Sequence, residues 1–173
     1  MLPDTLHTLP KVSGAQEKFP AIVENGKIRL AADDERSTHI LKPAPWDETI
    51  TTRKQIPANE NLTMQIASQV YRIRTAANGL CFSPSGEAIY ITKRFDVAED
   101  ESRYGMEDFA SLVGKDEIGG GVNYKYDGCY EDIAIAIRKY IPAWPVAMEE
   151  FFRLLVFNYI YGNGDAHLKN FSI

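Results

Sequence analysis

The apolar positions of the chain predict short strands and one helix in its first half and helices in its second half. Two apolar runs, residues 19–23 and 27–30, flank Asn25-Gly26, and this dipeptide between two such runs is typical of a tight β-hairpin. A further strand is predicted at residues 38–42, where the prolines that follow end it because proline has no N–H for a strand ladder. The polar stretch that continues to Pro57 is expected to be an exposed loop.

A helix is predicted next, beginning at Asn59 and ending at Asn78-Gly79, a pair that favours helix termination. Its apolar stripe lies at intervals of four, four and three residues: Leu62, Ile66, Val70 and Ile73. Glu60 falls in the first turn of this predicted helix, where the helix dipole favours a carboxylate.

A second hairpin is predicted from residues 80–83 and 88–95, and its returning strand is apolar at first and charged at its end. The acidic, irregular stretch 97–104 follows, and it has the composition of a boundary between domains. We therefore expect a first domain at residues 1–98 and a second at residues 99–173.

The second part of the chain has a helical pattern. Residues 106–113 form a short predicted helix with acids at its start, and residues 115–128, which contain three consecutive glycines, are expected to be flexible, either as a substrate-facing loop or as a long connection. Helices are then predicted at residues 133–140 and from Pro145 onward, since proline is favoured at a first helical position. The last helix is apolar on nearly all sides and is therefore expected to be a buried platform for the residues after it.

The composition of the chain indicates a globular domain and argues against several other classes of protein. The 173 residues are 45% hydrophobic and 25% charged, which is ordinary for a globular domain, and 19 basic against 24 acidic residues give a net charge of -5. An acidic chain argues against broad, sequence-independent binding to nucleic acid. Cys81 and Cys129 lack metal-ligand spacing and are expected to be small buried apolar residues. We expect a cytoplasmic protein, because no secretory signal and no apolar run long enough for a membrane span are present.

Residues 165–170, near the end of the chain, bring together an acid, an imidazole, a cation and an amide within six positions. Asp165 and Asn170 are five positions apart, the interval that protein kinases use between the aspartate that orients the attacking hydroxyl and the asparagine that holds a metal ion. A solvated turn is the alternative, since asparagine, glycine and aspartate are common turn residues. A zinc hydrolase built on His167 is disfavoured, because neither His7 nor His39 has a metal-ligand spacing to it.

Two features earlier in the sequence could bind the phosphates of a nucleotide. The glycine-containing turn at residues 13–18 could cradle a phosphate with its backbone N–H groups, although a single glycine also fits an ordinary turn. Lys42 ends a predicted strand and could contact phosphates, or it could simply lie in solvent. Glu60 could pair with this lysine, as a helix glutamate does in protein kinases, in place of its dipole role.

Taken together, these residues resemble the HipA family of serine/threonine kinases, toxin components of bacterial toxin–antitoxin pairs. The matching motifs lie in order along nearly the whole chain: Ser13-Gly14-Ala15-Gln16-Glu17-Lys18, Thr38-His39-Ile40-Leu41-Lys42, Asn59-Glu60, Arg94-Phe95-Asp96, Glu107-Asp108 and Gly164-Asp165-Ala166-His167-Leu168-Lys169-Asn170-Phe171-Ser172. The resemblance implies an α+β, protein-kinase-like fold, with an antiparallel N-lobe sheet and helices in the first domain. The second domain would be the beginning of a helical C-lobe that ends in the catalytic loop.

The resemblance also implies roles for individual residues. Asp165 would be the catalytic residue that accepts the hydroxyl proton, and Asn170 would hold Mg²⁺. The implied ATP-binding residues are Ser13, Gly14, Ala15, Gln16, Glu17, Lys18, Lys42, Lys93, Arg94, Phe95, His167, Leu168, Lys169 and Asn170. Ser13 matches the second of two serines in some short-form relatives and is a candidate for autophosphorylation.

The chain departs from the family pattern in several places. Lys11 stands where the best-studied member carries its autophosphorylated serine, and Lys93 replaces an acid in the adenine connection. The small amino-terminal subdomain of full-length members is missing, so a separate small protein could supply it. In the family a second metal-binding aspartate follows the catalytic loop, whereas this sequence stops at Ile173, so we expect weak or no kinase activity from it and an exposed apolar patch on its last helix.

The leading interpretation is therefore a HipA-like serine/threonine kinase that uses ATP and Mg²⁺. The implied partners are a protein substrate such as an aminoacyl-tRNA synthetase and a helix-turn-helix antitoxin, with no direct nucleic-acid contact and no membrane contact. The alternative is a non-catalytic module that binds a nucleotide or an antitoxin and transfers nothing.

Overall fold

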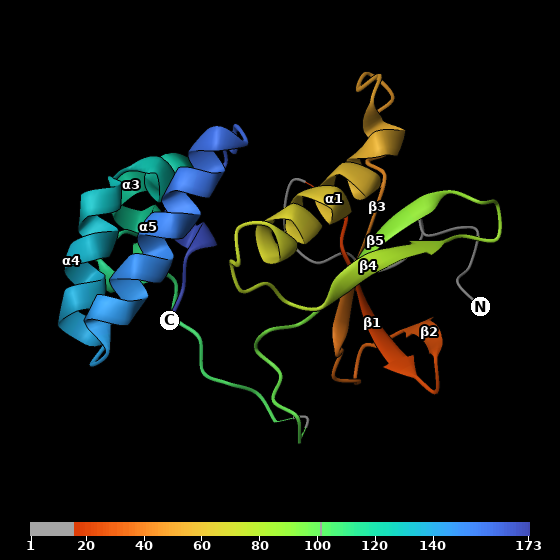
Figure 1. Ribbon diagram of the computed structural model, residues 1–173, viewed down its shortest axis with the longest axis horizontal. Coiled ribbons are helices and arrows are strands. Elements are labelled where there is room, and N and C mark those ends of the chain that lie inside the picture. Colours follow the sequence, from red (N-terminus) through yellow and green to blue (C-terminus); the bar gives the residue numbers. More distant parts are fainter. Residues whose placement is uncertain (1–15, 101) are drawn as a thin grey trace. The chain divides into compact units, whose positions relative to one another are not determined.

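The computed structural model describes residues 16–100 and 102–173, and the chain separates into two compact units that meet between Tyr104 and Gly105. The first unit is built on a five-stranded sheet in the order β2-β1-β3-β5-β4 (Figure 1). The strands are β1 (Phe19–Glu24), β2 (Lys27–Leu30), β3 (His39–Pro43), β4 (Asn78–Phe82) and β5 (Ala88–Lys93). Every neighbouring pair is antiparallel, as the sequence predicts for the first domain.

The first hairpin forms where the sequence predicts it. Asn25 and Gly26 both have positive φ, 52° and 72°, the backbone that a two-residue hairpin turn needs. The turn sets the register that pairs Glu24 with Lys27 and Ala21 with Leu30.

Alternate residues of the strands form the core of this unit. Phe19, Ala21, Leu41 and Ile89 are buried together, with the ring of Trp46 centred 6.3 Å from that of Phe19. Because side chains of a strand point to opposite faces in turn, this alternation leaves Pro20 and Ile22 on the other face of β1.

Helix α1 (Ile56–Gln69) crosses the sheet against β4 and β5 (Figure 1), and its bounds correct the prediction. It begins before Asn59, after the short 3-10 turn η2 (Arg53–Gln55), because Pro57 suits a first helical turn. It ends well before Asn78-Gly79, which belong to β4. The predicted apolar stripe is also wrong: Leu62 is exposed, and the helix buries the compact residues Pro57 and Ala67 against the sheet.

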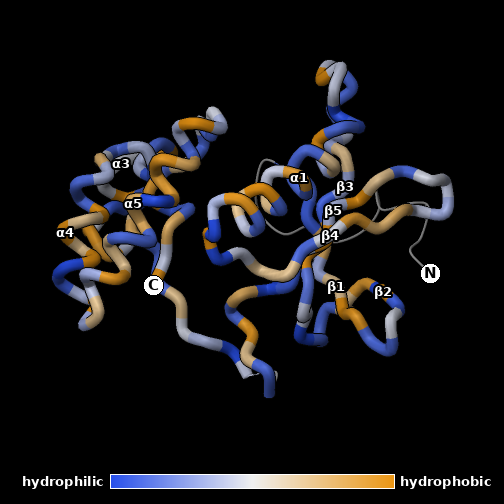
Figure 2. The backbone as a smooth tube through the Cα atoms, in the orientation of Figure 1, coloured by the Kyte–Doolittle hydropathy of each residue, from blue (hydrophilic) through white to orange (hydrophobic). Residues whose placement is uncertain are grey.

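The second unit is helical. It comprises α2 (Phe109–Leu112), α3 (Glu117–Gly120), η3 (Gly121–Tyr126), α4 (Tyr130–Tyr140), α5 (Trp144–Ile160) and η4 (Leu168–Asn170). Hydrophobic residues occupy the middle of α4 between hydrophilic residues at both ends (Figure 2), and its buried residues, Ile133, Ala136 and Ile137, face the core that α4 shares with α5. This core is completed by Phe109, Ala110, Phe151, Ala166, Leu168 and Phe171.

Three expectations for this unit are wrong. Cys129 is exposed, because it lies just before α4 and outside the core. Residues 115–128 are not an open flexible stretch, because they form α3 and η3, with Asp116 capping α3 by accepting the N–H of Gly119 at 2.8 Å. Helix α5 is not buried on nearly all sides, although Phe151 and Phe157 are buried. Phe152 and Tyr159 are 65% and 89% exposed, because the described elements cover one side of the helix, so apolar side chains lie at the surface as expected. None of the described helices is long and apolar enough to span a membrane.

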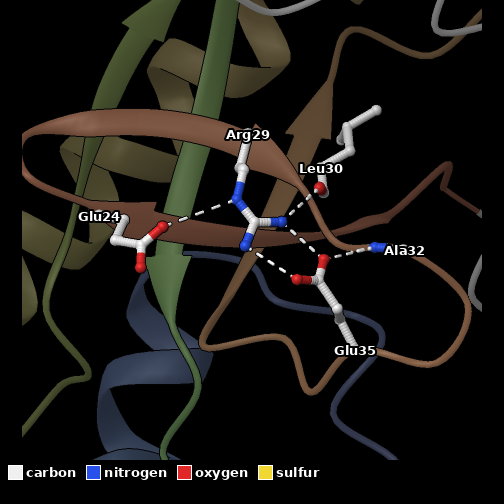
Figure 3. A network of polar contacts seen from close by, with 5 residues as sticks. All are labelled: Glu24, Arg29, Leu30, Ala32 and Glu35. Atoms are coloured by element: carbon white, nitrogen blue, oxygen red, sulfur yellow. Dashed lines mark hydrogen bonds and ion pairs between the residues drawn. The ribbon is translucent and has the colours of Figure 1, made fainter.

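An exposed polar network fixes the end of the first hairpin (Figure 3). The guanidinium of Arg29 donates to both carboxylate oxygens of Glu35, at 2.6 and 2.9 Å, and approaches Glu24 at 3.8 Å. Glu35 also accepts the backbone N–H of Ala32 at 2.9 Å. These hydrogen bonds, chiefly those from Arg29, lower the pKa of Glu35 from 4.5 to about 2.

This shift predicts the acid response of the hairpin. Because the pKa of Glu35 is lower in the folded state, its contribution to stability is present above pH 4.5 and is lost as the pH falls toward about 2. We expect Glu35→Gln to speed exchange of the Ala32 amide relative to wild type at pH 6, and this difference should close near pH 2. Amide exchange compared across that range measures it, with Glu48→Gln as an exposed control. A difference that persists unchanged at pH 2 would show that the carboxylate is not responsible.

Candidate active site

The first unit holds Lys42 in a defined position. This lysine lies on β3, the central strand of the sheet, and its Nζ donates to Oε1 of Glu60 on α1. The Lys42 and Glu60 side chains are 21% and 26% exposed, so the pair is largely shielded from water. No acidic residue lies in the first turn of α1, so the dipole interpretation of Glu60 is wrong and the ion pair is the role that the structure gives it.

Tyr90 supports this lysine from the neighbouring strand. Lys42 is directly opposite Tyr90 in the register of β3 and β5, and its Nζ lies 5.5 Å from the centre of the phenol ring. Burial raises the pKa of Tyr90 to about 12, so the phenol stays neutral beside the ammonium group at physiological pH. A lysine held by a helix glutamate is the arrangement with which protein kinases position a phosphate-binding cation.

The predicted phosphate turn is only partly within the described residues. Ser13, Gly14 and Ala15 lie outside them, so their predicted roles stay predictions. Gln16 is described, and its Nε2 donates to the backbone carbonyl of Pro43 at 3.3 Å, one residue beyond Lys42. Glu17 and Lys18 lead directly into β1. The end of this turn is therefore tied to the strand that carries the lysine.

The predicted adenine connection is tied down by ion pairs. Lys93 is the last residue of β5, and Phe95 is exposed. Arg94 donates to both carboxylate oxygens of Asp96, at 2.9 and 2.6 Å, and these bonds hold the pKa of Asp96 below its ordinary value. Arg103 also contacts Asp96, at 2.7 Å, and donates to the carbonyl of Ser37 at 3.1 Å.

This network lies beside a cleft of about 360 Å³, which does not include Lys42. The cleft is lined by Arg36, Ser37, Thr38, Val97, Asp100, Ser102 and Arg103. The sequence analysis missed Arg103, because its partner Ser37 lies 66 residues earlier and no local pattern connects them.

In the second unit, Asp165 is presented to solvent by a well-anchored loop. Its side chain is 74% exposed, and Oδ1 accepts a hydrogen bond from the hydroxyl of Tyr126 at 3.3 Å. The loop around it is anchored by buried Ala166, Leu168 and Phe171. These anchors distinguish it from the solvated turn that the sequence left open, since a free turn buries no apolar side chains.

Asn170 closes the loop on Asp165. Its Nδ2 donates to the backbone carbonyl of Asp165, and the backbone N–H groups of His167 and Asn170 bond within the same loop at 2.8 and 2.9 Å. Since the amide nitrogen is engaged, the amide oxygen is the atom with which Asn170 can serve a metal ion.

Lys169 and His167 point to different partners. Lys169 forms an ion pair with Asp108 at 2.8 Å, and the hydrogen bond to Asp108 raises the pKa of Lys169. The His167 side chain is only 8% exposed, and its Nε2 lies 3.7 Å from Oδ1 of Asp165. Leu168 is buried in the core and anchors the loop. Of these three residues, His167 therefore faces the Asp165 carboxylate, whereas Leu168 and Lys169 hold the loop in place.

The described residues fit a metal ion that is held largely by nucleotide phosphates. No group of three or more histidine, cysteine, aspartate or glutamate side chains in the described part of the chain is placed to hold a metal, so the zinc interpretation has no site there. The amide oxygen of Asn170 offers one oxygen ligand on the loop. Mg²⁺ typically binds one or two protein oxygens together with water and phosphates, so this oxygen matches part of its donor set.

The antiparallel sheet with its lysine–glutamate pair, followed by a helical unit that carries an aspartate–asparagine loop, defines a kinase-like α+β protein. The chain belongs to the family of HipA-like C-terminal domains, whose family model matches residues 11–173. The resemblance and the fold class inferred from the sequence are thereby confirmed.

Curated relatives and a solved structure agree with this assignment. The chain is 31% identical to Y4mE of Sinorhizobium fredii over 180 residues and 28% identical to a Haemophilus influenzae protein over 169, and their names class both provisionally as kinases. The matches cover 94% and 93% of this chain but only 38% and 46% of the relatives. One chain in the solved complex of HipA, HipB and operator DNA from the Shewanella oneidensis MR-1 toxin–antitoxin system has a similar fold. The TM-score is 0.69 at 22% identity, and the match covers 98% of this chain and 41% of that one.

The ion pair predicts a measurable coupling between its partners. In a double-mutant cycle with Lys42→Met and Glu60→Gln, we expect a coupling free energy on the order of 1 kcal/mol, because the pair is largely shielded from water. Urea unfolding followed by Trp46 fluorescence in a Trp144→Phe background reports on the first unit.

The matched control is the exposed pair of Lys54 and Glu87, which are 3.4 Å apart and should couple weakly. Equal coupling in the two cycles would contradict a special role for Lys42 and Glu60.

Proposed function

We propose that the chain carries the nucleotide-binding and catalytic-loop residues of a HipA-like serine/threonine protein kinase, which transfers the γ-phosphoryl group of ATP to a protein hydroxyl. The observation that carries the proposal is the ion pair between Lys42 and Glu60 in the first unit. The second unit of the same chain presents Asp165 beside Asn170. Membership of the HipA-like family and the kinase names of its relatives support the same reaction.

Each residue has a definite part in this reaction. Lys42, fixed by Glu60, binds the phosphates of ATP, together with the turn that ends at Lys18. Asp165 orients the acceptor hydroxyl and accepts its proton while the oxygen–phosphorus bond to the acceptor forms and the bond to ADP breaks. When bound, Mg²⁺ would neutralise charge on the phosphates, and Asn170 is the residue that would hold it.

The proposed partners follow from the same family. A protein with a serine or threonine hydroxyl, such as an aminoacyl-tRNA synthetase, is the proposed substrate, and a helix-turn-helix antitoxin is the proposed binding partner. The solved Shewanella complex contains HipA with HipB and operator DNA, which supports a toxin–antitoxin role. Because that complex contains DNA, the prediction that this protein makes no direct nucleic-acid contact is not supported. A separate small protein that supplies an amino-terminal subdomain stays part of the proposal.

A second candidate, a module that binds ATP without transferring phosphate, is favoured by one observation. Among the described residues, no group of three or more histidine, cysteine, aspartate or glutamate side chains is placed to hold a metal, so the catalytic loop offers Asn170 without a carboxylate dedicated to the metal. The two candidates differ in whether the γ-phosphoryl group leaves ATP.

Phosphotransfer from radiolabelled ATP tests the proposal. With the gene product that contains this chain, we expect label on a protein acceptor and a loss of about 100-fold or more in rate for Asp165→Asn, since a positioned base contributes roughly that much. The control Asp33→Asn, an exposed carboxylate in the other unit, should keep the wild-type rate.

Label that survives Asp165→Asn would refute the role of Asp165. ATP binding without any transfer, measured on the same samples, would support the non-catalytic module.

A further inference from the structure

Three tyrosines of one segment reach the catalytic loop of the second unit. The hydroxyl of Tyr126 donates to Oδ1 of Asp165 at 3.3 Å, and that of Tyr130 donates to the carbonyl of Ala166 at 3.1 Å. The ring of Tyr124 lies 5.7 Å from Nζ of Lys169. This tyrosine segment, residues 124–130, therefore contacts the loop at successive points along its length.

A glycine allows the tyrosine segment to come this close. A Cβ atom on Gly128 would lie 2.8 Å from Cδ1 of Leu168, closer than real Cβ contacts come, and 3.1 Å from Oδ2 of Asp132, closer than most of them. Leu168 is buried in the core of the unit, so it has little room to retreat. The approach between the two segments is thus fixed by packing on one side and by hydroxyl groups on the other.

The two oxygens of the Asp165 carboxylate have different surroundings. Oδ1 accepts the bond from Tyr126 and faces Nε2 of His167 at 3.7 Å. In the described part of the chain, Oδ2 takes part in no hydrogen bond or ion pair. A carboxylate held through one oxygen keeps the other available as a proton acceptor.

His167 is itself held against this carboxylate. Its ring meets that of Tyr126 edge to face, with centroids 5.0 Å apart and an interplanar angle of 88°. Its Nδ1 is buried with no hydrogen-bond partner among the described residues. A bare Nδ1 lone pair is cheaper to bury than an unpaired N–H, which favours the tautomer with hydrogen on Nε2, the nitrogen that lies 3.7 Å from Oδ1 of Asp165.

We propose that Tyr126 is a positioning residue for phosphotransfer, which holds the Asp165 carboxylate in one rotamer so that Oδ2 faces the acceptor hydroxyl. The catalytic consequence rests on the proposed kinase function, whereas the fixed rotamer does not. Tyr126 is half exposed, so its hydroxyl contributes mainly through this bond and little through burial. The competing role, in which the phenol occupies the place of the acceptor hydroxyl and blocks it, makes the opposite prediction for activity.

The first test measures the rotamer without any need for activity. Three-bond couplings to the Asp165 side-chain carboxyl carbon report its χ1 angle in the 173-residue chain, which at 19.5 kDa suits NMR. We expect one dominant χ1 rotamer in wild type and in the control Tyr159→Phe, whose phenol is 89% exposed, and averaged couplings in Tyr126→Phe. Couplings that stay the same in Tyr126→Phe would overturn the proposal, whatever the protein does with ATP.

The second test measures the kinetic consequence. Tyr126→Phe keeps the ring against His167 and removes only the hydroxyl, so we expect kcat for phosphotransfer to fall on the order of tenfold with the KM for ATP unchanged. A rise in kcat would assign the blocking role, and an unchanged kcat would also overturn the catalytic part of the proposal. If wild type transfers no phosphate, the proposed kinase function fails, while the couplings still decide the positioning role of Tyr126.

Discussion

The ion pair between Lys42 and Glu60 is the interaction on which the account of this molecule depends. A free lysine on a sheet is a mobile charge, whereas this one is held by a helix carboxylate and lies beside a neutral phenol. Three elements must be correctly placed to form it: the central strand β3, the neighbouring strand β5 and helix α1. The hairpin of β1 and β2, the core around Phe19 and the helix start at Pro57 all serve this placement.

The second unit holds the exposed carboxylate of Asp165 in place. It does so by burying alternate residues of the loop, Ala166 and Leu168, and by pairing the residues after it with the strand-like backbone before α2. Phe109 donates its backbone N–H to the carbonyl of Phe171, and Glu107 and Ile173 exchange both backbone hydrogen bonds at 3.0 Å. The loop is therefore fixed at both ends and at its centre, which is the support that a positioned acid or base requires.

Local patterns predicted the strands, the first hairpin and the aspartate–asparagine loop, because each depends on residues close together in the sequence. The sequence misplaces helix α1, because Pro57 in its first turn also fits a loop and because small side chains form its buried face. The contacts of Tyr126 with Asp165 and of Lys169 with Asp108 span 39 and 61 residues, so no spacing rule could reveal them. The sequence overestimates the burial of α5, because an apolar composition does not say which neighbouring elements cover a helix.

Calorimetry with Mg-ATP tests most directly whether Lys42, fixed by Glu60, binds nucleotide phosphates. We expect wild type to bind, and we expect Lys42→Ala to weaken the affinity by tenfold or more, because a shielded cation is lost from the phosphate site. Glu60→Gln should weaken it less, and Lys54→Ala, on an exposed lysine of the same unit, should leave it unchanged. Equal affinities for wild type and Lys42→Ala would contradict the account.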